Sequence, residues 1–390
     1  MNKNAIKNFS IWARRKLIAD AAYRAGLMGI TPEGIAAALP QSTLTTEFYD
    51  IGTREPYALT GDAVMQRRRL VDTIRRKERE TNYATAYKYV LEEVAYTWFN
   101  RLIAIRFMEV NDYLPSHVRV LSSESGKLEP DLVARPFDAD LDFSAEEEAE
   151  IRRLHDANDV DALFQLLFIK QCNALNGILP RLFEKTSDET ELLFRASVVD
   201  REGVVYKLVH DIPEEDFNIE KGGQVEIIGW LYQYYNTEPK NEAFAKNGKI
   251  SKEEIPAVTQ LFTPDWIVRY MVENSLGRVV INNLKYDNWA EEEKAKIDVL
   301  RPKWKYYVDD APQTPEVETE LRAMEHHKYG SGDQLPFVDT TLLDPCMGSG
   351  HILVYAFDVF MDIYRVMGWS DRDAAQRIIQ KNLFGCSLEQ

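Results

Sequence analysis

The stretch Leu342-Leu343-Asp344-Pro345-Cys346-Met347-Gly348-Ser349-Gly350-His351 decides the fold class, because it joins a strand pattern to a helix pattern. Before it, Phe337 to Leu343 is a short β-branched and apolar run typical of a buried strand. After it, Ser349 to Met367 has helical spacing and is closed by Gly368. The two glycines allow a sharp turn and the close approach of a ligand, and the start of the helix offers unpaired N–H groups.

Two common phosphate-binding loops do not match this turn. A P-loop requires Gly-Lys-Ser/Thr at the start of the helix, but Gly350 is followed by His351 and Ile352. A dinucleotide-binding loop requires a third small residue at position 353, which is Leu353. The turn is therefore either a ligand site of another kind or a structural turn of an α/β protein.

A second strand pattern follows the helix. Ser370 to Asp373 resembles a capping box that starts a short helix to about Gln380, and Asn382 to Glu389 again resembles a strand. Strand, turn, helix and strand make one βαβ unit, which needs further parallel strands to bury both of its faces. We therefore expect residues 251–390 to be the beginning of an α/β Rossmann-like domain that is truncated before those strands.

The chain upstream of this unit is predicted to be mainly helical. Residues 1–250 form an N-terminal helical domain with an acidic linker near 138–150, and the apolar spacing predicts helices at about 10–27, 84–110, 161–185 and 224–236. Thr263 and Pro264 predict a helix with Thr263 as N-cap, ending near Gly277. Residues 285–335 are charged and contain prolines, which indicates an insertion with helical pieces.

Composition narrows the class of protein. The three cysteines are scattered and form no metal-ligand spacing with the six histidines, so neither a disulfide framework nor a metal site is expected. No run of 18 apolar residues occurs, and the N-terminus lacks the apolar core of a signal peptide, so we expect a soluble cytoplasmic protein.

Charge is unevenly distributed in a chain whose formal net charge is −16. Residues 61–110 contain ten basic and seven acidic side chains, whereas Asp138 to Glu150 contains seven acids and no base. The basic residues around Arg67 to Arg79 are either solvated helix faces or a patch that contacts the DNA backbone.

Three segments resemble the motifs of DNA methyltransferases that modify amino groups. Asp-Pro-x-x-Gly-Ser-Gly resembles motif I, which wraps the methionine part of S-adenosylmethionine; Phe-Thr-Pro resembles motif X, which covers the cofactor pocket; and Asn382 to Cys386 resembles the start of motif II. The resemblance implies that S-adenosylmethionine is the cofactor. The implied cofactor-binding residues are Phe262, Thr263, Pro264, Asp344, Pro345, Cys346, Met347, Gly348, Ser349, Gly350 and Glu389.

Two positions depart from the pattern of these enzymes. The acid that usually binds the ribose hydroxyls is replaced by Ser387, which leaves Glu389 as the weaker candidate. His351 stands where such enzymes often carry an apolar residue, and we interpret it as a pocket wall or a satisfied histidine rather than a general base.

Longer segments resemble one subfamily, the PglX-type adenine-specific methyltransferases of BREX phage-exclusion systems. They are Thr97 to Glu109, Val225 to Tyr235 and Thr259 to Gly277. The resemblance implies adenine-N6 methylation of a specific DNA site as a self mark in phage defence, with double-stranded DNA and other BREX proteins as partners.

The motif that holds the target base in this family, Asn/Asp-Pro-Pro-Tyr/Phe, is absent, because none of the 16 prolines follows an Asn or another Pro. We therefore assign no catalytic residue and expect the chain alone to be inactive. Two alternatives remain: a type I or IIG restriction-modification methyltransferase, and a non-catalytic interaction module in which the Gly-Ser-Gly turn is structural.

Overall fold

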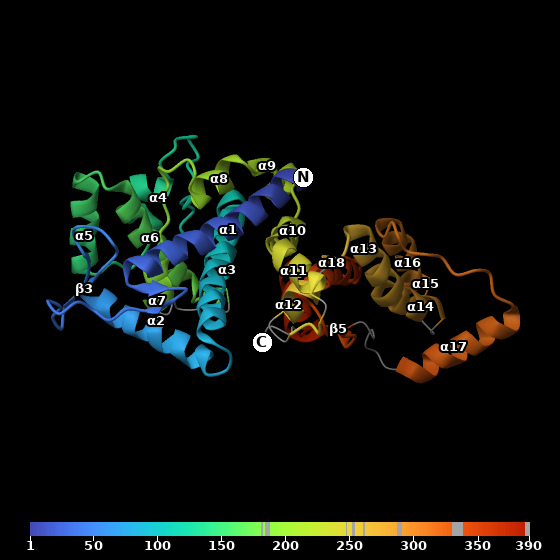
Figure 1. Ribbon diagram of the computed structural model, residues 1–390. Helices are drawn as coiled ribbons and strands as arrows, with labels where there is room; N and C mark the ends of the chain where they lie inside the picture. Colours follow the sequence, from blue (N-terminus) through green and yellow to red (C-terminus); the bar gives the residue numbers. More distant parts are fainter. Residues whose placement is uncertain are drawn as a thin grey trace. The chain divides into compact units, whose positions relative to one another are not determined.

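The computed structural model describes residues 1–180, 182–183, 188–246, 248–251, 254–259, 262–286, 291–329 and 338–386 (Figure 1). The chain forms two compact units, Met1–Glu238 and Pro239–Gln390. The division predicted from the sequence lies 12 residues later, between residues 250 and 251. Within the described ranges, no helix is long and apolar enough to cross a membrane.

The first unit is built around helix α3 (Tyr83–Val110), which the apolar spacing predicted. Asn82 starts it, because its side chain accepts a hydrogen bond from the Thr85 N–H at 3.0 Å. Helices α1 (Lys3–Leu27), α2 (Asp62–Glu78) and α10 (Glu226–Tyr235) pack against α3 (Figure 1). The buried Trp98 stacks on Phe194 with ring centroids 3.9 Å apart, so aromatic side chains fill much of this core.

Two short antiparallel hairpins, which the sequence analysis did not predict, precede α2. Strand β1 (Ile30–Thr31) pairs with β2 (Gly34–Ile35), and β3 (Thr46–Tyr49) pairs with β4 (Tyr57–Thr60). These strands have only two to four residues each, which is too short for a clear alternation of apolar and polar positions.

Two predicted boundaries in this unit are wrong. Helix α6 (Val160–Leu175) does not continue to residue 185, because Gly177 and Pro180 follow its end and interrupt the helix. The predicted acidic linker is partly helical, since α5 (Ala145–Asp156) begins within it. Ser144 and Glu147 form a reciprocal capping box there, and the acidic first turn favours a helix N-terminus.

Shorter helices complete the first unit. They are α4 (Asp131–Ala134), η1 (Pro136–Ala139), α7 (Asp188–Leu193), α8 (Val204–His210), α9 (Glu214–Phe217) and η2 (Ile219–Lys221).

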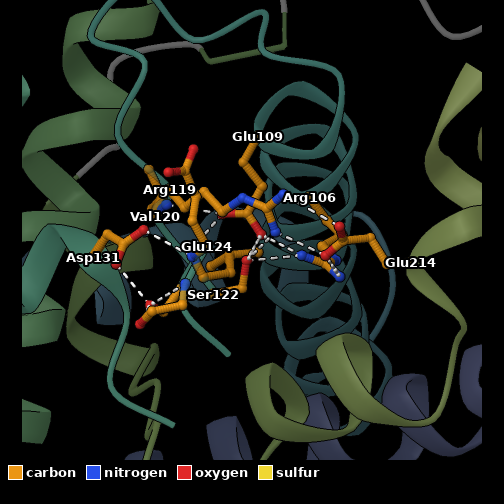
Figure 2. Close-up of polar contacts among 11 residues, drawn as sticks. Arg106, Glu109, Arg119, Val120, Ser122, Glu124, Asp131 and Glu214 are labelled. Carbon is orange, nitrogen blue, oxygen red and sulfur yellow. Dashed lines mark hydrogen bonds and ion pairs between the residues drawn. The ribbon is translucent and has the colours of Figure 1, made fainter. Parts of the chain in front are cut away.

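A buried polar network joins α3 to the loop that follows it (Figure 2). Glu109 accepts hydrogen bonds from the N–H groups of Val120 at 2.8 Å and Leu121 at 2.7 Å. The other oxygen of Glu109 accepts from Arg106 at 2.7 Å and from the Ser122 hydroxyl at 2.9 Å. Both charged side chains are almost inaccessible, at 1% exposed for Arg106 and 0% for Glu109. The carboxylate therefore accepts hydrogen bonds from four buried donors.

The exposed rim of this network is Glu214 on α9, which pairs with both Arg106 and Arg119 (Figure 2). Hydrogen bonds from Arg119 lower the pKa of the Glu214 carboxyl from its usual range, although its burial alone would raise that pKa. The network thus connects three segments of the first unit: α3, the loop around Ser122, and α9.

The second unit consists mainly of helices beside one small parallel sheet. Its first helices are α11 (Thr237–Ala245), α12 (Ile255–Thr259), α13 (Asp265–Val272), the π-helical turn η3 (Glu273–Gly277) and α14 (Arg278–Tyr286). The region predicted as an insertion contains α15 (Glu291–Lys294), α16 (Lys296–Leu300), η4 (Arg301–Lys303) and α17 (Pro315–Tyr329). The last elements are β5 (Leu342–Asp344), α18 (His351–Val366), α19 (Asp371–Arg377), the π-helical turn η6 (Ile378–Asn382) and β6 (Leu383–Gly385).

The helix predicted from Thr263 to Gly277 differs at both ends. Pro264, with extended backbone, occupies the N-cap position of α13 instead of Thr263. The helix also does not end at Gly277, because η3 leads directly into α14. Gly277 is needed there for packing: a Cβ on it would lie 2.9 Å from the ring of the buried Trp304.

The predicted βαβ unit is present, with shorter strands than expected. Strand β5 covers residues 342–344 rather than 337–343, and it pairs in parallel with β6, Leu342 opposite Leu383 and Asp344 opposite Gly385. Residues 337 and 387–390 lie outside the described residues. Helix α18 packs against both strands and against α13, and its buried face includes Ala356, Val359, Phe360 and Ile363.

Candidate functional site

The glycine turn connects the end of β5 to the start of α18. The buried Asp344 ends the strand, and its carboxylate accepts a hydrogen bond from the Cys346 N–H at 3.0 Å. The loop is also tied to the neighbouring strand, since the Met347 N–H donates to the Cys386 carbonyl at 2.9 Å. A third bond, from the Gly350 N–H to the Met347 carbonyl at 2.7 Å, closes the turn. The loop is therefore held open by its own backbone and by one buried carboxylate.

The two glycines of the turn have left-handed backbone conformations. The φ angles are +51° at Gly348 and +79° at Gly350, which side chains with a Cβ rarely adopt. Among the described residues, apart from the glycine and its two chain neighbours, no heavy atom lies within 4 Å of the position that a Cβ would take at either residue. The space above the loop is therefore open to a ligand, next to the first N–H groups of α18.

Gly385 in β6 has the opposite environment. A Cβ there would overlap the Met347 side chain and would lie 2.8 Å from Cδ1 of Leu353. The glycine thus allows Met347 to lie across the second strand, which positions the loop between β5 and α18. The contact between Gly385 and Met347 was not predicted from the sequence.

The segment before α13 lies beside the glycine turn. The rings of Phe262 and His351 are stacked, 4.5 Å apart and inclined by only 8°. The Nδ1 of His351 donates to the carbonyl oxygen of Thr263 at 3.1 Å. His351 is therefore a satisfied histidine that joins two segments 88 residues apart in sequence.

A buried carboxylate fixes α13 to α18, and the sequence analysis did not single it out. Glu273, with no exposed surface, accepts a hydrogen bond from the Tyr355 hydroxyl at 2.6 Å and another from the Tyr306 N–H at 2.5 Å. Burial raises the pKa of the Tyr355 hydroxyl, and the Glu273 carboxylate raises it further. An acid within an apolar helical run is the only sequence signal for this contact.

The start of β6 is held by Asn382. Its side-chain amide donates to the carbonyls of Val338 at 3.2 Å and Thr340 at 2.7 Å, and its oxygen accepts from the Tyr364 hydroxyl at 3.0 Å. This residue therefore aligns β6 with the chain that enters β5. Ser387 and Glu389, the residues considered for ribose binding, lie outside the described residues.

The structure brings together ten of the eleven predicted cofactor-binding residues in one unit. Phe262, Thr263, Met347 and Gly350 are half-buried, and Asp344 is buried. The others are exposed: Pro264, Pro345, Cys346, Gly348 and Ser349. Their surfaces are thus available at the carboxyl end of β5, the end at which open α/β sheets bind ligands.

No family model matches the chain. Two individual proteins are similar to it over its whole length. The adenine-specific methyltransferase PglX of Lacticaseibacillus casei (strain Zhang) is 46% identical over 398 residues, which cover 100% of this chain and 31% of that protein. The adenine-specific methyltransferase BrxX of Escherichia coli O9:H4 (strain HS) is 35% identical over 392 residues, covering 100% of this chain and 30% of that protein.

The chain is a homologue of the PglX-type adenine-specific methyltransferases. The resemblance predicted from the sequence is thereby confirmed. The chain spans about a third of the length of these PglX-type relatives. The similarity covers both units, so it includes the helical unit as well as the glycine turn.

Proposed function

We propose that this chain is the cofactor-binding part of an S-adenosylmethionine-dependent DNA adenine-N6 methyltransferase. The observation that carries the proposal is the open turn of Gly348 and Gly350, with left-handed backbone and free space above both residues, at the carboxyl end of a parallel strand. The names of the two relatives favour adenine methylation over other reactions of the same cofactor.

The residues around the turn suit this cofactor. The exposed backbone of 348–350 accommodates the methionine part, because a ligand can approach glycine without meeting a Cβ. Phe262 and Thr263 lie beside the loop through His351 and are placed to cover one side of the bound molecule. S-adenosylmethionine supplies an activated methyl group, and these residues bind and orient it.

The exposed surface of the small sheet is consistent with a larger Rossmann-like domain in the whole protein. Leu343 and Phe384 are register partners on β5 and β6, and they are 60% and 48% exposed. A parallel sheet is stable when both faces are covered, so this pair indicates a face on which further elements pack. We extend the proposal to a complete α/β methyltransferase domain that includes this sheet.

The biological setting follows from the resemblance to the PglX family. We propose that the whole protein marks self DNA in a BREX phage-exclusion system in the cytoplasm, with double-stranded DNA and other BREX proteins as partners. The similarity to two enzymes named PglX and BrxX supports a PglX-type methyltransferase over a type I or IIG restriction-modification enzyme.

Calorimetric titration with S-adenosylmethionine tests the proposed site directly. We expect residues 1–390 to bind the cofactor measurably and the double variant Gly348→Val, Gly350→Val to lose binding by at least about tenfold, or about 1.4 kcal/mol. Branched side chains would occupy the space that a cofactor at the turn requires.

The matched control is Gly52→Val, Gly126→Val. Both of these glycines have left-handed φ angles and open space, so the control carries similar backbone strain outside the glycine turn. Equal loss of binding in both double variants, or none in either, would show that the Gly-Ser-Gly turn is structural and would favour the interaction-module alternative.

His351 should set cofactor affinity through the position of Phe262. In His351→Ala the ring stack and the bond to the Thr263 carbonyl are both lost, so the dissociation constant should rise about tenfold. His351→Phe retains the stack and should restore most of the affinity. Calorimetry on the three proteins measures the affinity for S-adenosylmethionine. If His351→Ala binds the cofactor as tightly as the unmodified chain does, His351 has no role in the cofactor site.

A further inference from the structure

Five exposed arginines form one face of helix α2 and its C-cap. At about 100° of rotation per residue, Arg68, Arg69, Arg75, Arg76 and Arg79 fall within an arc of about 120°. They extend over roughly 16 Å along the helix axis. The helix dipole favours cations in the last turn but does not account for Arg68 and Arg69, which precede that turn.

Arg67, which the sequence analysis grouped with these residues, has a structural role. It is only 7% exposed, and it donates to the carbonyls of Met28 at 2.8 Å and Ala36 at 3.0 Å. Its guanidinium also lies 4.0 Å from the centroid of the Tyr49 ring. The sequence cluster therefore divides into the buried Arg67, which holds the hairpins, and an exposed face on which Arg68 pairs with Glu47 of β3.

Three of the exposed arginines are unpaired. Across the described ranges, Arg75, Arg76 and Arg79 have neither a hydrogen bond nor an ion pair, although the exposed Asp72 lies three and four residues before Arg75 and Arg76. On α5, by contrast, Arg152 pairs with Glu148 and Arg153 with Glu150 at similar spacings. The α2 face thus differs from an ordinary solvated helix, whose charges pair with each other.

We propose that this α2 face, centred on Arg75, Arg76 and Arg79, binds the phosphate backbone of duplex DNA. A row of unpaired guanidinium groups on a chain of formal net charge −16 is suited to a polyanion, and contacts of such groups with phosphates fix the position of a duplex. The identification of the polyanion as DNA rests on the proposed methyltransferase function. The face therefore positions the DNA without selecting its sequence.

The test is the salt dependence of DNA binding by residues 1–390, measured by fluorescence anisotropy with a labelled duplex. Each phosphate contact contributes about 0.9 to the slope of log affinity against log salt concentration. The variant Arg75→Gln, Arg76→Gln, Arg79→Gln should weaken binding to unrelated duplexes alike and reduce the slope by about 2 to 3. The control Arg135→Gln, Arg152→Gln, Arg153→Gln removes the same charge from arginines that are already ion-paired and should change neither quantity.

Three results would overturn the proposal: an unchanged slope in the α2 variant, an equal change in the control, or no DNA binding by the unmodified chain at low salt.

A parallel titration with polyglutamate distinguishes DNA from an acidic protein partner. If the α2 variant loses polyglutamate binding to the same extent as DNA binding, the partner is an acidic protein. Calorimetry with S-adenosylmethionine on the same variants keeps the two proposals separate. A chain that fails to bind cofactor yet shows the α2-dependent slope would overturn the methyltransferase proposal and leave the polyanion face in place.

Discussion

Replacing Glu109 by Ala should destabilise the first unit by about 3–5 kcal/mol. The substitution removes the buried carboxylate partner of Arg106, which keeps its ion pair with the more exposed Glu214, and it removes the acceptor for the N–H groups of Val120 and Leu121. Both charged side chains are almost fully buried, so the loss of these hydrogen bonds is costly. Urea unfolding followed by circular dichroism measures the loss, and thermal unfolding should shift by on the order of 10 °C.

Glu150→Ala on α5 is the matched control. Glu150 pairs with Arg153 at the same three-residue spacing, but the two side chains are 42% and 63% exposed. Exposed ion pairs contribute at most about 1 kcal/mol, so this variant should unfold nearly as the unmodified chain does. A loss of less than 1 kcal/mol in Glu109→Ala would contradict the role assigned to the network.

The sequence predicted helices where one apolar stripe and a cap coincide. Helix α3 matched the pattern at 84–110 within one residue, with Asn82 as its cap. Helix α6 was predicted too long, because Ile178, Leu179 and Leu182 continue the apolar spacing past Gly177. Local pattern therefore located the helices better than it located their ends.

Contacts between distant segments could not be read from local pattern. Three of the four donors to Glu109 lie 11 to 13 residues later, and Glu214 pairs with Arg106 from 108 residues away. Likewise the glycine turn was located from residues 342–351 alone, whereas its connection to Phe262 through His351 depends on how α13 packs against α18. Glu273 and Tyr355 support that packing, and only the folded chain identifies them.

Methyl transfer should require more than the cofactor site. Binding the cofactor lowers no barrier unless the adenine amine is held in line with the methyl group. The Asn/Asp-Pro-Pro-Tyr/Phe motif that holds the base is absent from residues 1–390. We therefore expect these residues alone to bind S-adenosylmethionine without turnover, and a full-length protein that contains them to methylate DNA.

Asp344 provides the control for the dependence on the glycine turn. In the full-length protein, Asp344→Ala should reduce transfer about a hundredfold, because the loop loses the acceptor for the Cys346 N–H and a buried partner for the turn. Asp344→Asn keeps an oxygen at this position and should retain much of the activity. Equal methyl transfer by all three proteins would show that the glycine turn does not contribute to the reaction.

The measurement that tests the central claim most directly is transfer of labelled methyl groups from S-adenosylmethionine to unmethylated duplex DNA. Residues 1–390 and the full-length protein are compared under identical conditions, with the proposed BREX partner proteins added to both. We predict N6-methyladenine in the DNA treated with the full-length protein and none with residues 1–390. Turnover by residues 1–390 alone would place the catalytic groups within this chain and contradict the account, and absence of transfer by the full-length protein would contradict the proposed activity.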